Sequence, residues 1–211
     1  MFIIEAILNL PESYPFGINR ISPFFLLKLG GNNPLLVKYG QAHRLLLSTV
    51  LHSGIVHWLA NTLSLLIFCA QIEAMCAFKL FIPVFIIAGV QGNMLFDLVH
   101  KIIGHWASLY VGSTPCICGA IGLLIAKIVV MYKKGEELKL LKWKILAMII
   151  CLAALLLVPE INIFGAIGGL ASGVLIGLTI LSWGDPDLGK FQMMGAVILA
   201  IYSVILCAIW I

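Results

Sequence analysis

Long runs of apolar residues recur along most of the chain, separated by short polar segments. A helix needs about 20 consecutive apolar residues to cross the hydrocarbon core of a bilayer. Runs of about this length lie at 51–70, 80–98, 109–132, 143–159, 161–182 and 192–211, the fourth being slightly short. The pattern predicts an all-α polytopic membrane protein with about six transmembrane helices.

The first 50 residues contain no run of this length. Prolines and glycines interrupt them, among them Pro11, Pro15, Gly17, Pro23, Gly30, Gly31 and Pro34. These residues favour turns and end helices, so we expect loops and short amphipathic pieces, with residues 24–27 dipping into the membrane surface. We therefore divide the chain into an outer segment (1–50), a transmembrane core (51–182), and a loop with a last helix (183–211).

The composition agrees with a membrane protein. Of the 211 residues, 62% are hydrophobic and 10% are charged, whereas a soluble domain carries about 25% charged residues. The net charge of +4 is scattered over loops, which gives no support for a nucleic-acid partner. The six cysteines fall mostly in apolar runs and are expected to pack there. We expect no cofactor.

Lysine placement predicts the orientation. The loop between the third and fourth runs is marked as cytoplasmic by Lys133, Lys134, Lys139, Lys142 and Lys144. Lys79 and Lys190 then also lie inside, while residues 1–50 and the loop around Lys101 lie outside. Four basic residues oppose this orientation: Arg20, Lys28, Lys38 and Arg44.

Two histidines and an asparagine lie where the chain enters the first apolar run. Polar groups inside a membrane are costly and indicate a functional site by default. His57 and Asn61 are four residues apart and share one face of a helix. His52, nine residues before Asn61, is out of phase with it, so we expect His52 to brace the helix entry rather than join the same pocket.

Glycines recur at every fourth position of the fifth run: Gly165, Gly169, Gly173 and Gly177. Such a stripe lets a neighbouring helix approach to backbone contact. Gly112 and Gly119 predict a second small-residue seam on the third run.

The order of these motifs resembles the rhomboid superfamily of intramembrane serine proteases and their inactive relatives. The resemblance covers residues 25–182. His52, His57 and Asn61 match the His-x4-His-x3-Asn pattern of the family's second helix, and Glu73 matches a recurrent acidic position. Arg44 matches the arginine that ends the outer loop, where His43 replaces a tryptophan.

Two glycine motifs extend the resemblance. Residues 112–119 align with Gly-x-Ser-Gly-x-x-x-Gly, and residues 165–173 align with Ala-His-x-x-Gly-x-x-x-Gly. The resemblance implies a rhomboid-like helical bundle in which His57 and Asn61 would hold an oxyanion.

The family ordinarily begins with a membrane helix before the outer loop, and this chain starts too late to supply it. We expect either a lost helix or a truncated product. The run 192–211 would then match the extra carboxy-terminal helix of many eukaryotic members, which favours a eukaryotic secretory-pathway membrane.

Both catalytic positions of the family are changed. Thr114 occupies the position of the nucleophilic serine, and Ala166 occupies that of the basic histidine. A hydroxyl is a weak nucleophile unless a base takes its proton, and alanine cannot do so. Pro115 replaces the glycine after the nucleophile and removes a backbone N–H where an oxyanion hole needs donors. The chain therefore resembles an inactive rhomboid.

Several other side chains are candidates for a nucleophile, a base or a metal ligand. Ser113 would point about 100° away from Thr114 on a helix, and Cys116 and Cys118 would be inert thiols in apolar surroundings. We expect His100 and His105 to lie at the membrane interface without a functional role, since no metal-ligand pattern accompanies them. Asp97 and Lys127 are expected to reach an interface.

Three hypotheses remain open. The favoured one is a pseudoprotease that binds transmembrane client proteins, in contact with membrane lipids, and changes their trafficking, stability or degradation. The alternatives are an active protease with threonine or relocated chemistry, and a membrane role unrelated to proteolysis. Neither the client nor the oligomeric state can be read from the sequence.

Overall fold

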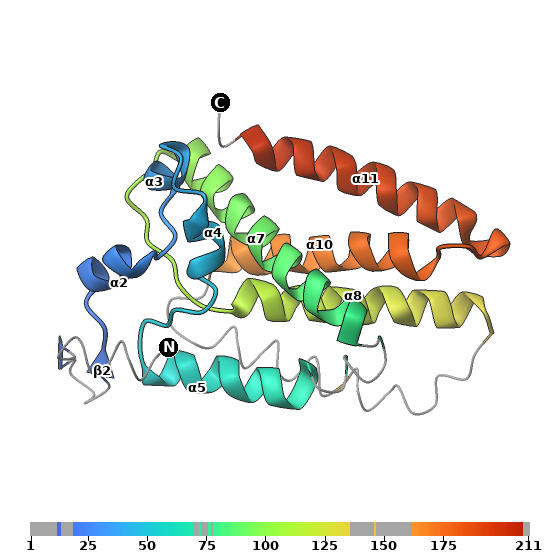
Figure 1. The fold of residues 1–211 in the computed structure, drawn as a ribbon, viewed down its shortest axis with the longest axis horizontal. Helices are drawn as coiled ribbons and strands as arrows, with labels where there is room; N and C mark the ends of the chain where they lie inside the picture. The colour runs from blue at the N-terminus through green and yellow to red at the C-terminus, as the bar shows by residue number, and fades with distance from the viewer. Residues whose placement is uncertain are drawn as a thin grey trace.

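The computed structural model describes residues 12–13, 19–69, 72, 76, 78–135, 146 and 162–208. Long helices form a bundle, and short helices gather at one end of it (Figure 1). The long elements are α5 (Ile55–Ser64) with its π-helical continuation η1 (Leu65–Cys69), α7 (Phe78–Ile102), α8 (Thr114–Lys133), α10 (Ile163–Leu181) and α11 (Gly189–Cys207). The short ones are β1 (Glu12–Ser13), β2 (Asn19–Arg20), α2 (Pro23–Leu29), α3 (Pro34–Lys38), α4 (His43–Leu47) and η2 (Pro186–Leu188).

Four helices of the described residues are long and apolar enough to cross a membrane, namely Lys79–Ile102, Thr114–Lys133, Ile163–Leu181 and Pro186–Cys207. They confirm the second, third, fifth and sixth predicted runs. The predicted run 143–159 lies outside the described residues. Glu73 and Cys151 lie outside them as well.

The first predicted run was wrong at its start. The helix begins at Ile55 rather than at residue 51, and α5 and η1 have 10 and 5 residues. Gly54 is fully extended, with φ −179° and ψ 175°. Residues 51–54 are therefore a loop that positions His52 independently of the helix. The third run also starts late, at Thr114, because residues 109–113 are not helical.

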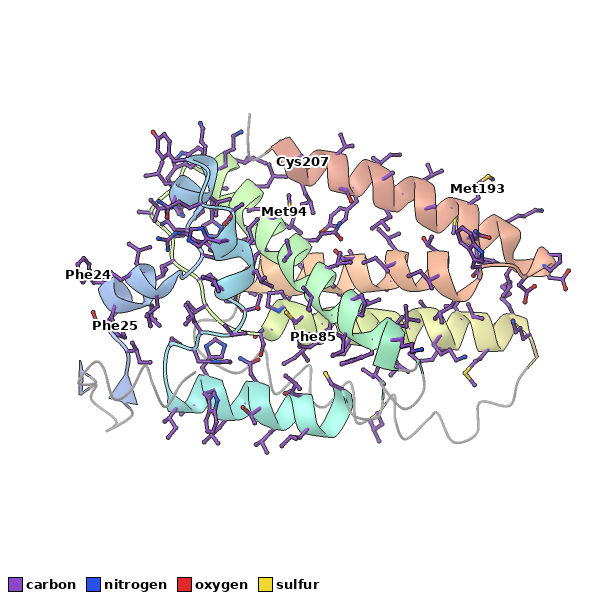
Figure 2. All side chains as sticks on the ribbon, in the orientation of Figure 1. Phe24, Phe25, Phe85, Met94, Met193 and Cys207 are labelled. Atoms are coloured by element: carbon purple, nitrogen blue, oxygen red, sulfur yellow. The ribbon has the colours of Figure 1, made fainter. Side chains whose placement is uncertain are left out.

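α8 is the central helix of the bundle. In its most apolar window 72% of the residues are buried, against 11% in the window of α11. α8 and α10 run alongside each other, and α11 lies on the outside (Figure 1). The side chains of α11 between Met193 and Ile205 include many exposed apolar groups (Figure 2), as expected for a helix that faces lipid.

The glycine stripe of α10 makes its contact with α8, as predicted. A Cβ on Gly169 would collide with the carbonyl of Pro115, and one on Gly173 would collide with the carbonyl of Gly119. Such close backbone approach is the usual role of small residues in membrane helix pairs. The predicted seam of Gly112 and Gly119 was wrong in one respect, because Gly112 precedes α8 and is not part of the helix.

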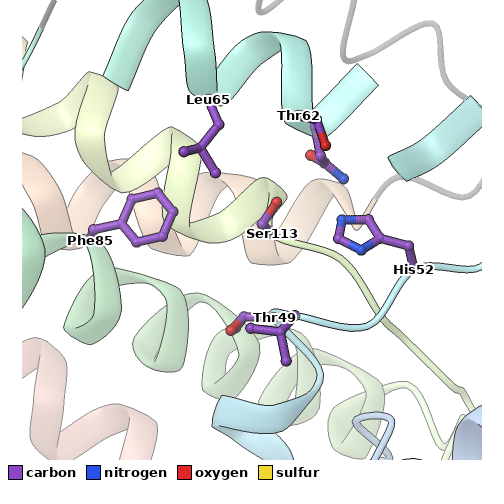
Figure 3. Close-up of a pocket in the computed structure, with 8 residues that line it drawn as sticks. Thr49, His52, Thr62, Leu65, Phe85 and Ser113 are labelled. Atoms are coloured by element: carbon purple, nitrogen blue, oxygen red, sulfur yellow. The ribbon is translucent and has the colours of Figure 1, made fainter. Parts of the chain in front are cut away.

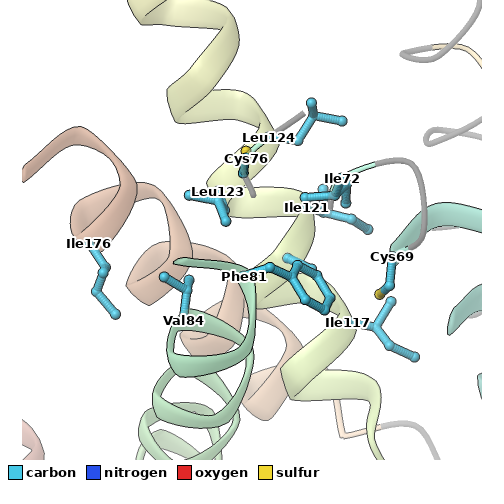
Figure 4. Close-up of a cluster of buried hydrophobic side chains, with 11 residues drawn as sticks. Cys69, Ile72, Cys76, Phe81, Val84, Ile117, Ile121, Leu123, Leu124 and Ile176 are labelled. Carbon is cyan, nitrogen blue, oxygen red and sulfur yellow. The ribbon is translucent and has the colours of Figure 1, made fainter. Parts of the chain in front are cut away.

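The apolar core lies between α7, the first half of α8, α10 and η1. Eleven buried residues form it (Figure 4): Cys69, Ile72, Cys76, Phe81, Val84, Ile117, Ala120, Ile121, Leu123, Leu124 and Ile176. Of the six cysteines, Cys69 and Cys76 belong to this core, and Cys116 and Cys118 are buried on α8. Cys207 is exposed, so the prediction that the cysteines pack in apolar surroundings fails there.

Lysines gather where α8 ends and α11 begins. Lys134 forms an ion pair with Asp185 (Nζ to Oδ2, 2.8 Å), and the Nζ of Lys133 lies 5.4 Å from the centre of the Phe191 ring. Lys190 follows in the first turn of α11. Lys133, Lys134 and Lys190 therefore share one end of the bundle, the end that the lysine pattern predicts to be cytoplasmic.

We expect Gly173→Val to lower the free energy of unfolding by at least about 2 kcal/mol, because the added methyl groups force α10 away from Gly119. Unfolding in detergent micelles titrated with sodium dodecyl sulfate, followed by circular dichroism, measures the loss. Gly189→Val is the matched control, since a Cβ there meets nothing within 4 Å. Equal unfolding midpoints for the two variants would contradict the contact.

Candidate functional site

We use the name cap layer for residues 21–54 and 103–113, which cover one end of α7 and α8. Two polar side chains of α7 hold this layer. Asn93 Nδ2 donates to the Leu45 carbonyl (2.8 Å) and to Ser48 Oγ (3.0 Å). Asp97 Oδ1 accepts a hydrogen bond of 2.7 Å from Asn32 Nδ2. The expectation that Asp97 reaches an interface was wrong, because its side chain is fully buried against the cap layer.

Arg44 organises the cap layer from within. Its Nη1 donates to the carbonyls of Leu27 (2.7 Å) and Gly31 (2.9 Å), and its Nε donates to Gln41 Oε1 (2.7 Å). The residue is buried. A buried guanidinium with three acceptors is a structural cross-link. Arg44, one of the four basic residues that oppose the predicted orientation, is therefore held inside the protein and is not a free charge in a loop.

The segment before α8 is fixed by the cap layer. The Gly112 N–H donates to the Ser48 carbonyl (2.8 Å), and Asn32 and Tyr110 exchange two backbone hydrogen bonds of 2.9 Å. Gly112 has φ +130° and lies against the His57 ring, where a Cβ would approach Cε1 and Nε2 to 2.6 Å. Glycine is required here both by conformation and by space.

A cavity of about 220 Å³ lies between α5, α7 and this segment (Figure 3). Eight residues line it: Thr49, Val50, His52, Asn61, Thr62, Leu65, Phe85 and Ser113. Leu65 and Phe85 face each other at one end, and His52 and Thr62 lie at the other (Figure 3).

His52 and Asn61 thus line the same cavity, and the expectation that His52 would stay out of it was wrong. The ring of His52 meets that of His57 edge to face, with centroids 5.4 Å apart. Burial, and next to it the neighbouring His57, lowers the pKa of His52 to about 4. The His52 imidazole in the loop before α5 is therefore neutral at physiological pH.

Thr114, at the nucleophile position, does not line the cavity. Its side chain is buried, and its Oγ1 donates to Asn61 Oδ1 at 3.2 Å. The Tyr110 hydroxyl is its second polar partner, and that hydroxyl donates to the Gly112 carbonyl (3.3 Å). Instead, Ser113, one residue earlier, faces the cavity. Sequence reasoning dismissed Ser113 by assigning it a helical direction, but Ser113 is the residue before α8, with φ −83° and ψ 4°.

The base position carries no imidazole. Ala166 lies buried in the first turn of α10, next to Gly165, whose N–H donates to the capping Asn162 Oδ1 at 2.6 Å. All five histidines of the chain are described. In the described part of the chain, Thr114 Oγ1 donates to the Asn61 amide oxygen rather than to an imidazole.

His100 and His105 lie apart from this cavity. The His100 ring packs against Phe96 with centroids 3.9 Å apart, and its Nδ1 lies 2.9 Å from the Phe96 carbonyl oxygen. His105 is exposed at 6.3 Å from the His100 centroid. Across the described residues, no three His, Cys, Asp or Glu side chains come close enough together to hold a metal ion.

Comparison with known proteins identifies this arrangement. The rhomboid domain family matches residues 39–183. The chain belongs to the rhomboid family, and it is an integral membrane protein.

Curated relatives agree with this membership. The chain is 27% identical over 159 residues to RHOMBOID-like protein 1 of Arabidopsis thaliana, covering 75% of this chain and 39% of that protein. It is 28% identical over 208 residues to Rhomboid protease GluP of Bacillus subtilis, covering 91% of this chain and 39% of that protein. It is 30% identical over 142 residues to Rhomboid-like protease 3 of Toxoplasma gondii, covering 64% of this chain and 51% of that protein. The chain spans less than two thirds of the length of these relatives.

We expect Arg44→Met to loosen the cap layer, because the carbonyls of Leu27 and Gly31 lose a charged donor. One such bond contributes about 2 kcal/mol, so cleavage of residues 21–54 by chymotrypsin under native conditions should accelerate about thirtyfold. Lys38→Met removes the same charge from an exposed position and serves as control. Equal cleavage rates in the two variants would argue against the cross-link.

Proposed function

We propose that this rhomboid-family protein is a pseudoprotease, in a eukaryotic secretory-pathway membrane, that binds transmembrane client proteins without cleaving them and so affects their trafficking, stability or degradation. The observation that carries the proposal is the state of the nucleophile position. The Thr114 hydroxyl is buried and bonded to Asn61, and the residue at the base position is Ala166.

Among the described residues, the polar partners of Thr114 are poor proton acceptors. Serine and threonine hydroxyls need an adjacent base to become nucleophiles. Asn61 accepts the hydrogen bond from Thr114 but is not a base. Burial raises the pKa of Tyr110, the other partner, so its phenol stays protonated at neutral pH. Loss of one member of a catalytic pair costs several orders of magnitude in rate.

The oxyanion side is altered as well. Pro115 is the second residue of α8 and has no N–H to donate. Asn61 Oδ1 is turned toward Thr114 by the hydrogen bond that it accepts. In the family Asn61 is the residue expected to help hold an oxyanion, and here part of its bonding capacity is used to anchor the start of α8.

The polar cavity supports a binding role. Inactive relatives of rhomboids, by the resemblance, use this fold to hold membrane proteins. The cavity combines hydroxyl and amide groups with apolar side chains, and such a mixed lining suits recognition without chemistry.

A second candidate is an active protease with relocated chemistry. One observation favours it, since Ser113 and the neutral His52 line the same cavity. Several relatives also carry the word protease in their names.

The two candidates predict opposite labelling by a fluorophosphonate probe. A pseudoprotease leaves the wild-type protein unlabelled after reconstitution in micelles, as measured by in-gel fluorescence. Labelling that disappears in Thr114→Ala or in Ser113→Ala, while both variants keep the wild-type circular dichroism spectrum, would refute the pseudoprotease proposal and name the nucleophile.

We expect Thr114→Ser alone to restore no cleavage of a model transmembrane substrate, because Ala166 at the base position cannot accept the serine proton. The triple variant with Pro115→Gly and Ala166→His supplies the missing imidazole and backbone N–H and should show slow cleavage. Gel-based detection of the product in proteoliposomes measures both. Robust cleavage by the single variant would reveal another base.

Client binding is tested separately from chemistry. In proteoliposomes, a labelled single-pass peptide should give energy transfer to a fluorophore fused to the wild-type protein, and Thr114→Ala should leave this signal unchanged. A scrambled apolar peptide of equal length sets the background from chance proximity. Signals no greater than this background for a panel of single-pass peptides would count against the binding role.

A further inference from the structure

The cavity beside Asn61 has an uncharged lining. None of its eight lining residues carries a formal charge at physiological pH: three have hydroxyl groups (Thr49, Thr62, Ser113), one is an amide (Asn61), one is the neutral His52, and three are apolar (Val50, Leu65, Phe85). A charged ligand would find no counter-ion among these side chains. The cavity therefore suits a neutral ligand with one polar and one apolar part.

One hydrogen-bond donor in the cavity is unused. Asn61 is buried, its Oδ1 accepts from Thr114, and its Nδ2 finds no hydrogen-bond partner in the described part of the chain. A buried unpaired N–H costs about 1–3 kcal/mol. A ligand with a carbonyl oxygen recovers this energy, because a carbonyl accepts without bringing a donor of its own.

The size of the cavity limits what can enter. The cavity of about 220 Å³ has room for a single chain with a carbonyl group. Val50 and Leu65 are partly exposed on the protein surface, at 48% and 38%, so the cavity can be entered past them.

The surroundings of the entrance are lipid. Leu65 belongs to η1 and Phe85 to α7. The same two elements expose neighbouring apolar side chains at Leu66, Ile86 and Ile87, as segments in a bilayer do. The molecules next to this entrance in a membrane are acyl chains.

We propose that the cavity binds the acyl ester of a neutral membrane lipid, with the ester carbonyl accepting from Asn61 Nδ2 and the first methylenes packed between Leu65 and Phe85. This site goes beyond the proposed client binding and does not depend on it.

The test compares two probes that differ at the carbonyl. 1-Monooleoylglycerol has one ester carbonyl, and its ether analogue has the same chain and headgroup without it. Native mass spectrometry of the full chain, equilibrated with each lipid in micelles, counts retained molecules. We expect one retained ester lipid per protein, bound about fivefold more tightly than the ether, the effect of a hydrogen bond of about 1 kcal/mol.

Two variants locate the site. Val50→Trp fills the cavity from its exposed edge and should reduce ester binding more than tenfold, whereas Leu46→Trp adds the same side chain at an exposed position outside the cavity and should change nothing. Asn61→Leu should abolish the difference between ester and ether. If Asn61→Leu fails to fold, Val50→Trp still decides the location.

Three results would overturn the proposal: equal retention of ester and ether by the wild type, unchanged retention in Val50→Trp, or equal losses in Val50→Trp and Leu46→Trp. The cavity would be assigned to the client instead if a transmembrane peptide displaced the lipid and if, without the peptide, the protein showed no preference for the ester. Failure of client binding in proteoliposomes has no bearing on these outcomes.

Discussion

Direct backbone contact between α8 and α10 is the constraint on which the rest of the molecule depends. Helices in a bilayer gain little from burying apolar surface against each other, because lipid is equally apolar, so close packing has to supply the association. Gly169 and Gly173 allow α10 to approach the carbonyls of Pro115 and Gly119. This contact fixes the first turn of α8, where Thr114 lies, against the first turns of α10, where Ala166 lies.

The cap layer is held in a different way. Its attachments to α7 are hydrogen bonds of buried amides and a buried carboxyl, through Asn93 and Asp97, and its interior is cross-linked by Arg44. Each of these groups would be costly to bury alone, so they stabilise one arrangement and exclude others. The result is a rigid frame that positions Gly112 against His57 whether or not the catalytic pair is present. The architecture of the site therefore does not depend on which residues occupy positions 114 and 166.

Much of this arrangement could be predicted from local patterns. The helices α7, α8, α10 and α11 follow from the length of their apolar runs, and the α8–α10 contact follows from the four-residue period of the glycines. His52 was misplaced because a helical direction was assigned to a residue that lies in an extended loop. Ser113 was misjudged for the same reason, because it precedes α8. Asp97 was misjudged because its surroundings come from segments distant in the sequence. Burial against such segments leaves no periodic signal in the chain.

The hydrogen bond between Asn32 and Asp97 joins residues 65 positions apart, and that between Asn33 Nδ2 and the Ser108 carbonyl (3.0 Å) joins residues 75 apart. During synthesis the segment carrying Asn32 and Asn33 emerges long before its partners on α7 and in the following loop. Asn33 Oδ1 can already accept from the Leu36 N–H, but until then the two Nδ2 groups depend on water, which a bilayer interior could not provide. The cap layer must therefore assemble late, on the aqueous side of the membrane, after α7 has been inserted.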